Sequence, residues 1–166
     1  MTIKNKTSIG NYLHKTVFIM RGISGSGKST FVKENLDFAK ICSADDFFVR
    51  LGKEVGQEYL FKQELLAKAH NECLQKFCEH VENNESFIVV DNTNLRLRDL
   101  KTYHEIALSK GYTVRVVQIH KAKEKCVSDN VHELNEDLIK KQHQIFVQNI
   151  DKIKELENVK VFDIHN

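Results

Sequence analysis

A glycine-rich stretch constrains the fold of this chain more than any other feature of the sequence. Residues 22–30 run GISGSGKST and match G-x-x-x-x-G-K-[ST], the pattern of a loop that binds phosphate. The apolar run Val17–Met20 before the loop predicts a buried strand, and the residues after it predict a helix. A flexible glycine-serine linker, which is the alternative, would require neither that apolar run nor the Lys-Ser-Thr ending. The stretch therefore predicts a nucleotide-binding site within an α/β fold.

The residue types in the loop suit this chemistry. Glycines let the backbone curl so that its N–H groups point at phosphates, and the helix that follows adds the positive end of its dipole. Lys28 is expected to reach the terminal phosphates as a catalytic group, and Ser29 to place its hydroxyl on Mg²⁺. The predicted nucleotide contacts are Gly22, Gly25, Ser26, Gly27, Lys28, Ser29 and Thr30.

Length and composition place the chain among ordinary globular proteins. Its 166 residues, 41% of them hydrophobic and 29% charged, are enough for one domain with a core. The net charge of +2 means that nucleic-acid binding would depend on local patches. Four cysteines without a C-x-x-C pair predict free thiols in a reducing compartment. No secretory signal or membrane span is visible in the sequence, so we expect a cytoplasmic protein, with the nucleus as the alternative. The sequence leaves the oligomeric state open.

Strands alternate with helices along the chain. Residues 1–15 are polar and contain lysines but no acid, which predicts a polar leader, with a basic nucleic-acid-binding arm as the alternative. Residues 16–166 are expected to form a single α/β domain with about five mostly parallel strands and helices on both faces. The predicted strands are 16–20, 39–42, 86–91, 112–119 and 159–164; the predicted helices are 28–35, 57–83, about 100–111, 122–129 and 136–156, the last broken near Asn149.

Acidic residues follow two of the predicted strands. Asp45 and Asp46 come after strand 39–42, at the sheet edge where open α/β folds bind ligands. We favour a catalytic role for Asp45 over a helix cap, whereas Asp46 suits either role. Asp91 ends strand 86–91, an arrangement that puts a carboxylate near Mg²⁺.

Polar side chains continue beyond Asp91. Asn92 and Thr93 begin a polar turn next to the predicted phosphates, which favours a binding role over that of ordinary turn residues. His70 lies beside the apolar stripe of the predicted helix 57–83, and we expect it to be structural rather than catalytic.

The order and spacing of these motifs resemble the P-loop polynucleotide kinases, in particular the kinase domain of the phage 5′-hydroxyl polynucleotide kinase and its animal relatives. The resemblance rests on Gly22–Thr30, Asp45–Asp46, Asp91–Leu95, Gly111–Val114 and Asn130, and it covers roughly residues 16–150. That family transfers the γ-phosphate of ATP to the 5′-hydroxyl of RNA or DNA. The resemblance therefore implies that residues 16–166 are a single P-loop kinase domain. It also implies ATP, or GTP as the alternative donor, together with Mg²⁺, an RNA or DNA 5′-end as partner, and a role in nucleic-acid repair.

The resemblance also assigns roles to individual residues. Asp45 would take the proton from the attacking hydroxyl, and Ser29 and Asp91 would serve the metal. The residues implied on the acceptor side are Asp46, Arg50, Asn92, Thr93 and Arg96, with Arg98 as a further phosphate contact.

Two departures from the family pattern keep other functions open. The lid of the family supplies an arginine, but residues 128–134 contain neither Arg nor Lys. The expected acceptor arginine is replaced by Phe48, with Arg50 two residues on. The alternatives are a small-molecule kinase and a nucleotide-binding module with little catalysis. The substitutes for the lid arginine considered from the sequence are Lys123, Lys125, His132, Lys140 and Lys141.

Overall fold

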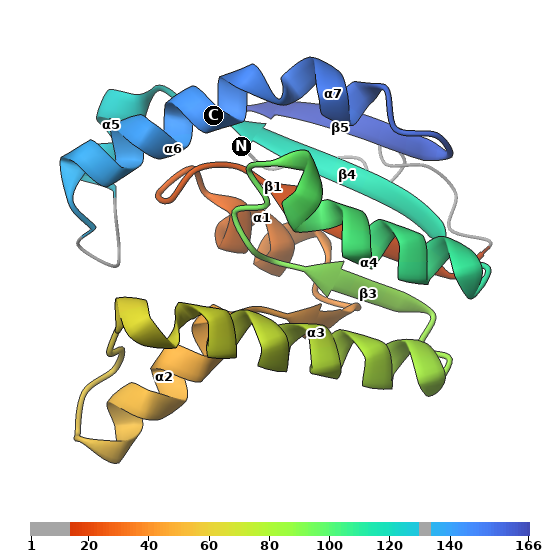
Figure 1. The fold of residues 1–166 in the computed structure, drawn as a ribbon, viewed down its shortest axis with the longest axis horizontal. Coiled ribbons are helices and arrows are strands. Elements are labelled where there is room, and N and C mark those ends of the chain that lie inside the picture. Colours follow the sequence, from red (N-terminus) through yellow and green to blue (C-terminus); the bar gives the residue numbers. More distant parts are fainter. Residues whose placement is uncertain (1–13, 130–133) are drawn as a thin grey trace.

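Five parallel strands form a single sheet in the order β2-β3-β1-β4-β5 (Figure 1). The computed structural model describes residues 14–129 and 134–166. The strands are β1 (Thr16–Arg21), β2 (Lys40–Cys42), β3 (Phe87–Val90), β4 (Thr113–His120) and β5 (Val159–His165). The predicted α/β fold with about five parallel strands is confirmed. Because all the strands are parallel, their carboxyl ends meet at one edge, where the phosphate-binding loop lies.

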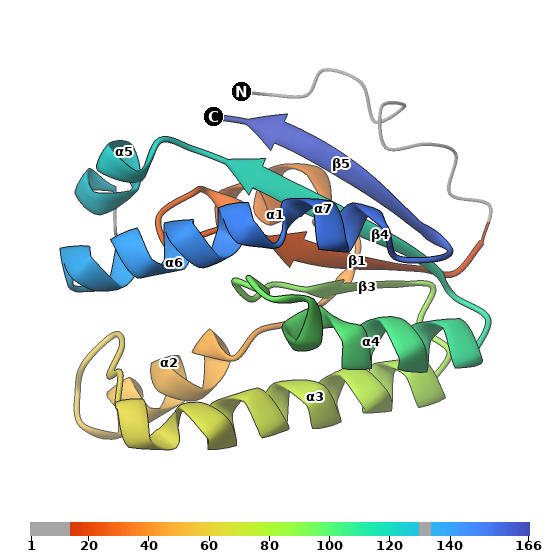
Figure 2. The same ribbon diagram turned by 45° about the horizontal axis from the view of Figure 1, so that its top comes forward.

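Helices cover both faces of this sheet, as predicted (Figures 1 and 2). On one face, α1 (Lys28–Asn35) buries Phe31 and Val32 against apolar side chains of the central strands. On the other face, α3 (Leu66–Glu82), α4 (Leu97–Ser109) and α7 (Ile150–Lys154) pack on the main core. The helix α6 (Glu136–Gln148) buries Ile139 and Phe146 beside Ile23 of the loop. The P-loop is therefore held between α1 and α6.

The segment between β2 and α3 differs from the prediction. A helix that was not predicted, α2 (Asp45–Glu54), precedes a loop, and the long helix expected from residue 57 begins only at Leu66 after a 3₁₀ turn. After α2 the chain reverses direction and passes close to Gly52. Only a glycine fits there, because a Cβ would lie 2.8 Å from the backbone nitrogen of Tyr59. The chain turns back on α2, where the Tyr59 and Phe61 rings pack on Phe48. The sequence pattern failed here because these aromatic residues serve a turn rather than a helix face.

Other boundaries agree more closely. The short helix α5 (Lys123–Ser128) falls within the predicted 122–129, and Asn149 separates α6 from α7 where a break was predicted. Residues 1–13 of the predicted leader lie outside the described residues, as do Asn130 and His132. Among the described helices, none combines the length and the apolar character that crossing a bilayer requires.

Candidate functional site

The backbone of the loop adopts conformations that favour glycine. Gly25 and Gly27 have φ angles of 77° and 96°, in the left-handed region where a Cβ is unfavourable. A Cβ on Gly25 would also lie 2.4 Å from the carbonyl oxygen of Cys126 in α5, so this helix packs directly on the loop. Gly27 occupies the N-cap position of α1, so the amide groups at the start of that helix border the same space.

A cavity of about 340 Å³ opens over the loop, and we refer to it as the phosphate cavity. It brings together most of the residues predicted to act on the nucleotide. Gly22 and Ser26 do not line it: the Gly22 N–H donates to the Thr93 carbonyl, and Ser26 is buried behind the loop. The predicted residues that line the cavity are Gly25, Gly27, Lys28, Ser29, Thr30, Asp45, Asp91, Asn92 and Thr93.

Lys28 is buried at the base of this cavity. Its Nζ donates to the carbonyl oxygen of Ile23 at 2.9 Å, which holds the ammonium over the first residues of the loop. Burial lowers the pKa of Lys28, whereas the negative charges of Asp91 and Asp45 oppose that change. The two carboxylates therefore face the lysine that is expected to contact phosphate.

Ser29 and Asp91 form a pair that suits a hard cation. The Ser29 hydroxyl donates to Oδ2 of Asp91 at 2.8 Å, and Oδ1 of Asp91 is buried with no hydrogen-bond partner among the described residues. Burial raises the pKa of Asp91, although Lys28 and the Ser29 hydrogen bond act in the opposite direction. No group of three or more metal-binding side chains occurs in residues 14–129 and 134–166. A site with few protein oxygens is typical of Mg²⁺, which keeps water and phosphate ligands. The residues present therefore fit the predicted metal.

Asp45 begins α2 but does not cap it. The N-cap position belongs to Ala44, and the N–H of Asp45 itself donates to the hydroxyl of Ser43 at 3.2 Å. Instead, Oδ1 of Asp45 accepts a hydrogen bond of 2.9 Å from the hydroxyl of Tyr59. The backbone of this turn is set by Asn92, whose side-chain oxygen accepts from the Ala44 N–H at 2.9 Å. Asn92 thus positions the start of α2 in addition to lining the cavity.

Two further cavities adjoin the phosphate cavity. The aromatic cavity, about 220 Å³, lies against Phe48, Tyr59 and Phe61 and shares Asp45 and Thr93 with the phosphate cavity. The outer cavity, about 530 Å³, shares Thr93 with both and extends to Arg96. The three cavities therefore meet at Thr93, in the turn after β3.

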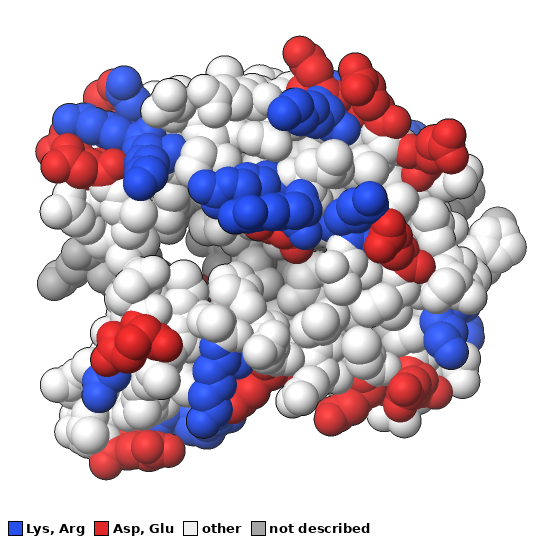
Figure 3. Space-filling model, viewed as in Figure 1, with Lys and Arg blue, Asp and Glu red and all other residues white. Residues whose placement is uncertain are grey.

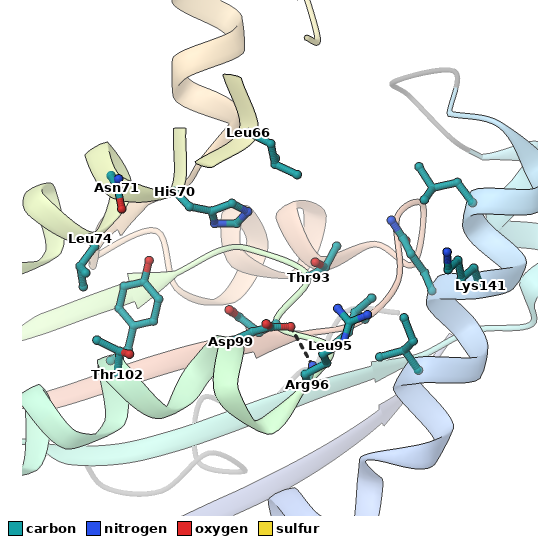
Figure 4. A pocket seen from close by; sticks show the side chains of 15 residues that line it. Leu66, His70, Asn71, Leu74, Thr93, Leu95, Arg96, Asp99, Thr102 and Lys141 are labelled. Carbon is teal, nitrogen blue, oxygen red and sulfur yellow. Dashed lines mark hydrogen bonds between the residues drawn. The ribbon is translucent and has the colours of Figure 1, made fainter. Parts of the chain in front are cut away.

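The outer cavity has walls from three helices. Figure 4 shows His70 on α3 and Lys141 on α6 on opposite sides of it, with Arg96 at the start of α4. The Arg96 N–H donates to the carboxylate of Asp99 at 2.8 Å, which fixes the first turn of α4. Figure 3 shows a hollow between the parts of the molecule that carry α6 and α2, with Lys and Arg side chains along its upper rim. His70, expected to be structural, thus lines a cavity wall.

Two of the predicted acceptor residues lie elsewhere. Asp46 forms an ion pair with Lys76 at 2.9 Å, and Arg50 forms one with Glu72 at 2.7 Å. Both pairs line a separate cavity between α2 and α3. The structure therefore does not bring Asp46 and Arg50 to the phosphate cavity, because successive residues of a helix point in different directions.

The structure also brings in residues that sequence reasoning missed. Tyr59 reaches Asp45 only because the chain reverses after α2, and no local pattern announces such a reversal. Lys121 lines the phosphate cavity, although none of the proposed substitutes for the lid arginine does so among the described residues. Its signal was available, because Lys121 comes directly after β4 and so lies at the ligand-binding edge of the sheet.

Comparisons with known proteins agree with this architecture. A family model described as an AAA domain (AAA_33) matches residues 17–147. Human NEDD4-binding protein 2 is 31% identical over 118 residues, which cover 69% of this chain and 6% of that protein. The chain therefore spans only a small part of this relative's length.

Solved structures share the fold at low sequence identity. The AvrRxo1-ORF1:AvrRxo1-ORF2 complex with ATP has a TM-score of 0.67 and 17% identity, covering 95% of this chain and 56% of the other. A chain of the Pnkp1/Rnl/Hen1 RNA repair complex has a TM-score of 0.65 and 16% identity, with coverages of 84% and 46%. A gluconokinase from Sinorhizobium meliloti has a TM-score of 0.52 and 14% identity, with coverages of 91% and 83%. Since the family model covers most of the residues and these neighbours share the fold, the chain belongs to this AAA domain family and has a P-loop kinase-like fold.

Proposed function

We propose that this protein is a kinase that transfers the γ-phosphate of ATP to the 5′-hydroxyl end of RNA or DNA. The observation that carries the proposal is the position of Asp45, whose side chain lines both the phosphate cavity and the aromatic cavity. A group at such a junction can contact a donor phosphate on one side and an acceptor hydroxyl on the other. A phosphotransferase needs a carboxylate in that place, whereas a protein that only binds nucleotide does not.

The proposed reaction uses residues already placed in the site. Lys28 and the loop amides bind the donor phosphates. Ser29 and Asp91 would hold Mg²⁺, which would neutralise charge on the phosphates. The acceptor oxygen attacks the γ-phosphorus, its proton passes to the carboxylate of Asp45, and the bond to the β–γ bridging oxygen breaks to release ADP. Tyr59 holds the carboxylate of Asp45 through the hydrogen bond to Oδ1.

The acceptor side supports a polymer substrate. The outer cavity adjoins the phosphate cavity and the aromatic cavity at Thr93 and is lined by the cations Arg96 and Lys141. Phosphates of a nucleic-acid backbone are bound by such side chains, and a single nucleoside would leave them unused. The likeness to a chain of an RNA repair complex favours the same substrate class. We therefore propose a role in nucleic-acid repair, in the cytoplasm or nucleus.

A small-molecule kinase is the second candidate. The aromatic cavity is small, about 220 Å³, and Phe48, Tyr59 and Phe61 give it the walls of a pocket for one sugar or nucleoside. The fold likeness to a gluconokinase supports this candidate. The pairing of Arg50 with Glu72 also leaves fewer free cations for a phosphorylated acceptor.

The test measures transfer of labelled γ-phosphate from ATP to matched acceptors. Purified full-length protein is offered 5′-hydroxyl RNA and DNA oligonucleotides, the same oligonucleotides with a 5′-phosphate, nucleosides, and gluconate. We expect label only on the 5′-hydroxyl oligonucleotides, and Asp45→Asn should reduce the rate by roughly 100- to 10,000-fold. Asp46→Asn is the matched control, because the neighbouring carboxylate faces another cavity, and it should keep the wild-type rate within about threefold.

The acceptor pattern separates the candidates. Label on a nucleoside or sugar but on no oligonucleotide would replace the first candidate by the second. Nucleotide binding that depends on Lys28, with no transfer to any acceptor, would leave only a nucleotide-binding module.

A further inference from the structure

Lys121 lines the phosphate cavity but has no role in the reaction proposed above. It follows β4 directly and points into the phosphate cavity, where its side chain is only 14% exposed. Its Nζ donates to the carbonyl oxygen of Gly25 at 3.2 Å and to Oδ2 of Asp129 at 2.6 Å. An ammonium carries three N–H groups, so one donor remains for a ligand after these two described contacts.

Lys121 and Lys28 contact neighbouring parts of the same loop. A P-loop lysine reaches the terminal phosphates, and Nζ of Lys28 lies at the carbonyl of Ile23. Lys121 lies at the carbonyl of Gly25, two residues further along the same loop. Both ammonium groups are therefore bound to carbonyls of the same loop, and both side chains line the phosphate cavity.

The negative group beside Lys121 is the carboxylate of Asp129, which a bound phosphate can displace. The side chain of Asp129 is 58% exposed, and Lys121 lowers the pKa of its carboxyl through a hydrogen bond. Because Asp129 is the exposed partner of this pair, water and ligands can reach its contact with the ammonium, and a triphosphate brings a higher charge density to the same ammonium. The carboxylate thus positions the lysine before the nucleotide binds.

We propose that Lys121 contacts the γ-phosphate of the donor and stabilises its charge during transfer, in the role that a lid arginine has in related kinases. Lys121 neither gives nor takes a proton in this step: the acceptor oxygen bonds to the γ-phosphorus, the acceptor proton goes to Asp45, and ADP leaves with the electron pair of the broken bond. The proposal rests on the proposed use of ATP as donor and does not depend on which acceptor is phosphorylated.

The test compares the binding of two nucleotides that differ in the terminal phosphate. Affinities for ADP and for the non-hydrolysable ATP analogue AMP-PNP are measured with Mg²⁺ by calorimetry on the wild type, Lys121→Met and Lys121→Arg. We expect Lys121→Met to weaken AMP-PNP binding roughly tenfold and to leave ADP binding within about twofold, because only one of the ligands has a γ-phosphate. Transfer by this variant should fall by roughly 100-fold or more, and Lys121→Arg should restore most of both properties.

Two control variants separate this role from a structural one. Lys125→Met changes an exposed lysine of α5 and should leave both affinities unchanged. Asp129→Asn breaks the same ion pair but keeps the ammonium, so it should preserve the preference for AMP-PNP over ADP.

Three outcomes would overturn the proposal. They are an unchanged ratio of the two affinities in Lys121→Met, an equal loss of both, or the same loss in Asp129→Asn as in Lys121→Met. The proposed function would fail on other results: Lys28→Ala binding nucleotide as the wild type does, or no acceptor being phosphorylated. If no acceptor is phosphorylated, the comparison of AMP-PNP with ADP binding still tests the role of Lys121.

Discussion

The hydroxyl of Tyr59 donates a hydrogen bond of 2.9 Å to Oδ1 of Asp45, although the two residues lie on opposite arms of a chain reversal. Asp45 begins α2, and Tyr59 follows that helix in a loop that returns along it. Burial raises the pKa of Tyr59, and the nearby charge of Asp45 raises it further, so the phenol stays protonated and remains a donor. The contact limits the orientations that the carboxylate can adopt.

Tyr59→Phe should therefore slow transfer without weakening ATP binding. Losing one hydrogen bond to a charged group costs about 1–2 kcal/mol, which corresponds to a decrease of roughly 5- to 30-fold in kcat. Tyr112→Phe is the matched control, because it removes a hydroxyl that donates to the Glu85 carbonyl at the amino end of the strands. Steady-state kinetics would contradict the role of Tyr59 if both variants had equal kcat values.

Gly25→Ala should abolish nucleotide binding. The new Cβ would meet the Cys126 carbonyl oxygen at 2.4 Å, and the φ of 77° would add strain. Gly111→Ala separates the two effects, because Gly111 has a φ of 79° but a Cβ added there would have no atom of another segment within 4 Å. We expect Gly111→Ala to cost about 1 kcal/mol of stability with normal nucleotide binding. Calorimetry and urea unfolding on both variants would refute the steric argument if Gly25→Ala bound ATP normally.

Arg21→Met should destabilise the fold strongly. The buried guanidinium donates to Gln118 Oε1 at 2.6 Å and to the carbonyls of Leu95 and Phe146 at 2.8 and 2.7 Å. Burial lowers the pKa of Arg21 to about 10, so it remains charged at neutral pH, helped by Asp99 and Asp163. Methionine would leave three acceptors without their donor, at a cost of about 3–5 kcal/mol in urea unfolding. Arg98→Met, at an exposed side chain, should change stability by less than about 0.5 kcal/mol.

Removing Arg96 and Lys141 together should weaken oligonucleotide binding in a salt-dependent way. If both side chains contact backbone phosphates, the Arg96→Ala, Lys141→Ala variant should reduce the slope of log K against log salt by about 2. ATP binding should stay unchanged, because neither residue lines the phosphate cavity. Lys33→Ala, on α1 across the sheet, is the control. An unchanged slope in fluorescence titrations would remove these residues from the acceptor path.

Asp163→Asn should destabilise the protein at neutral pH but less in acid. Burial tends to raise the pKa of Asp163, but hydrogen bonds from His120, Lys154 and Gln118 lower it from 3.8 to about 2. Because the folded pKa is below the unfolded one, this stabilisation is present above about pH 5 and is lost as the pH falls toward 2. After allowance for solvent screening we expect about 1 kcal/mol at pH 7 and roughly half of it at pH 3. Equal effects of the substitution at both pH values in urea unfolding would contradict the assignment.

The strands and the loop were predictable because they depend on local patterns. Val17–Met20 is a continuous apolar run, and all four residues are fully buried in the central strand. Asp45 was predicted at the ligand-binding edge because it follows a strand of a parallel sheet, and Asp91 was predicted near Mg²⁺ because it ends the next strand. The role of Asp45 remains a prediction that Asp45→Asn tests, and the role of Asp91 remains a prediction.

The parts of the fold and of the site that were not predicted depend on contacts between residues that no local pattern connects. Nothing local indicates that Gly52 and Tyr59 touch, so α2 and the Tyr59 contact were missed. Arg50 was expected near the acceptor from its distance along the chain, but one turn of helix carries it to Glu72. Lys121 was passed over because lid residues were sought further along, although it follows its strand just as Asp91 follows β3.

The meeting of three cavities at Thr93 has a consequence for how such proteins diversify. The donor side is built by the loop and the turn after β3, whereas the walls of the outer cavity come from α3, α4 and α6. Substitutions on those helices can change the size and charge of the acceptor space without disturbing the residues around the phosphates. One fold can therefore evolve toward new acceptors through substitutions on α3, α4 and α6, while the residues that carry out the transfer stay the same.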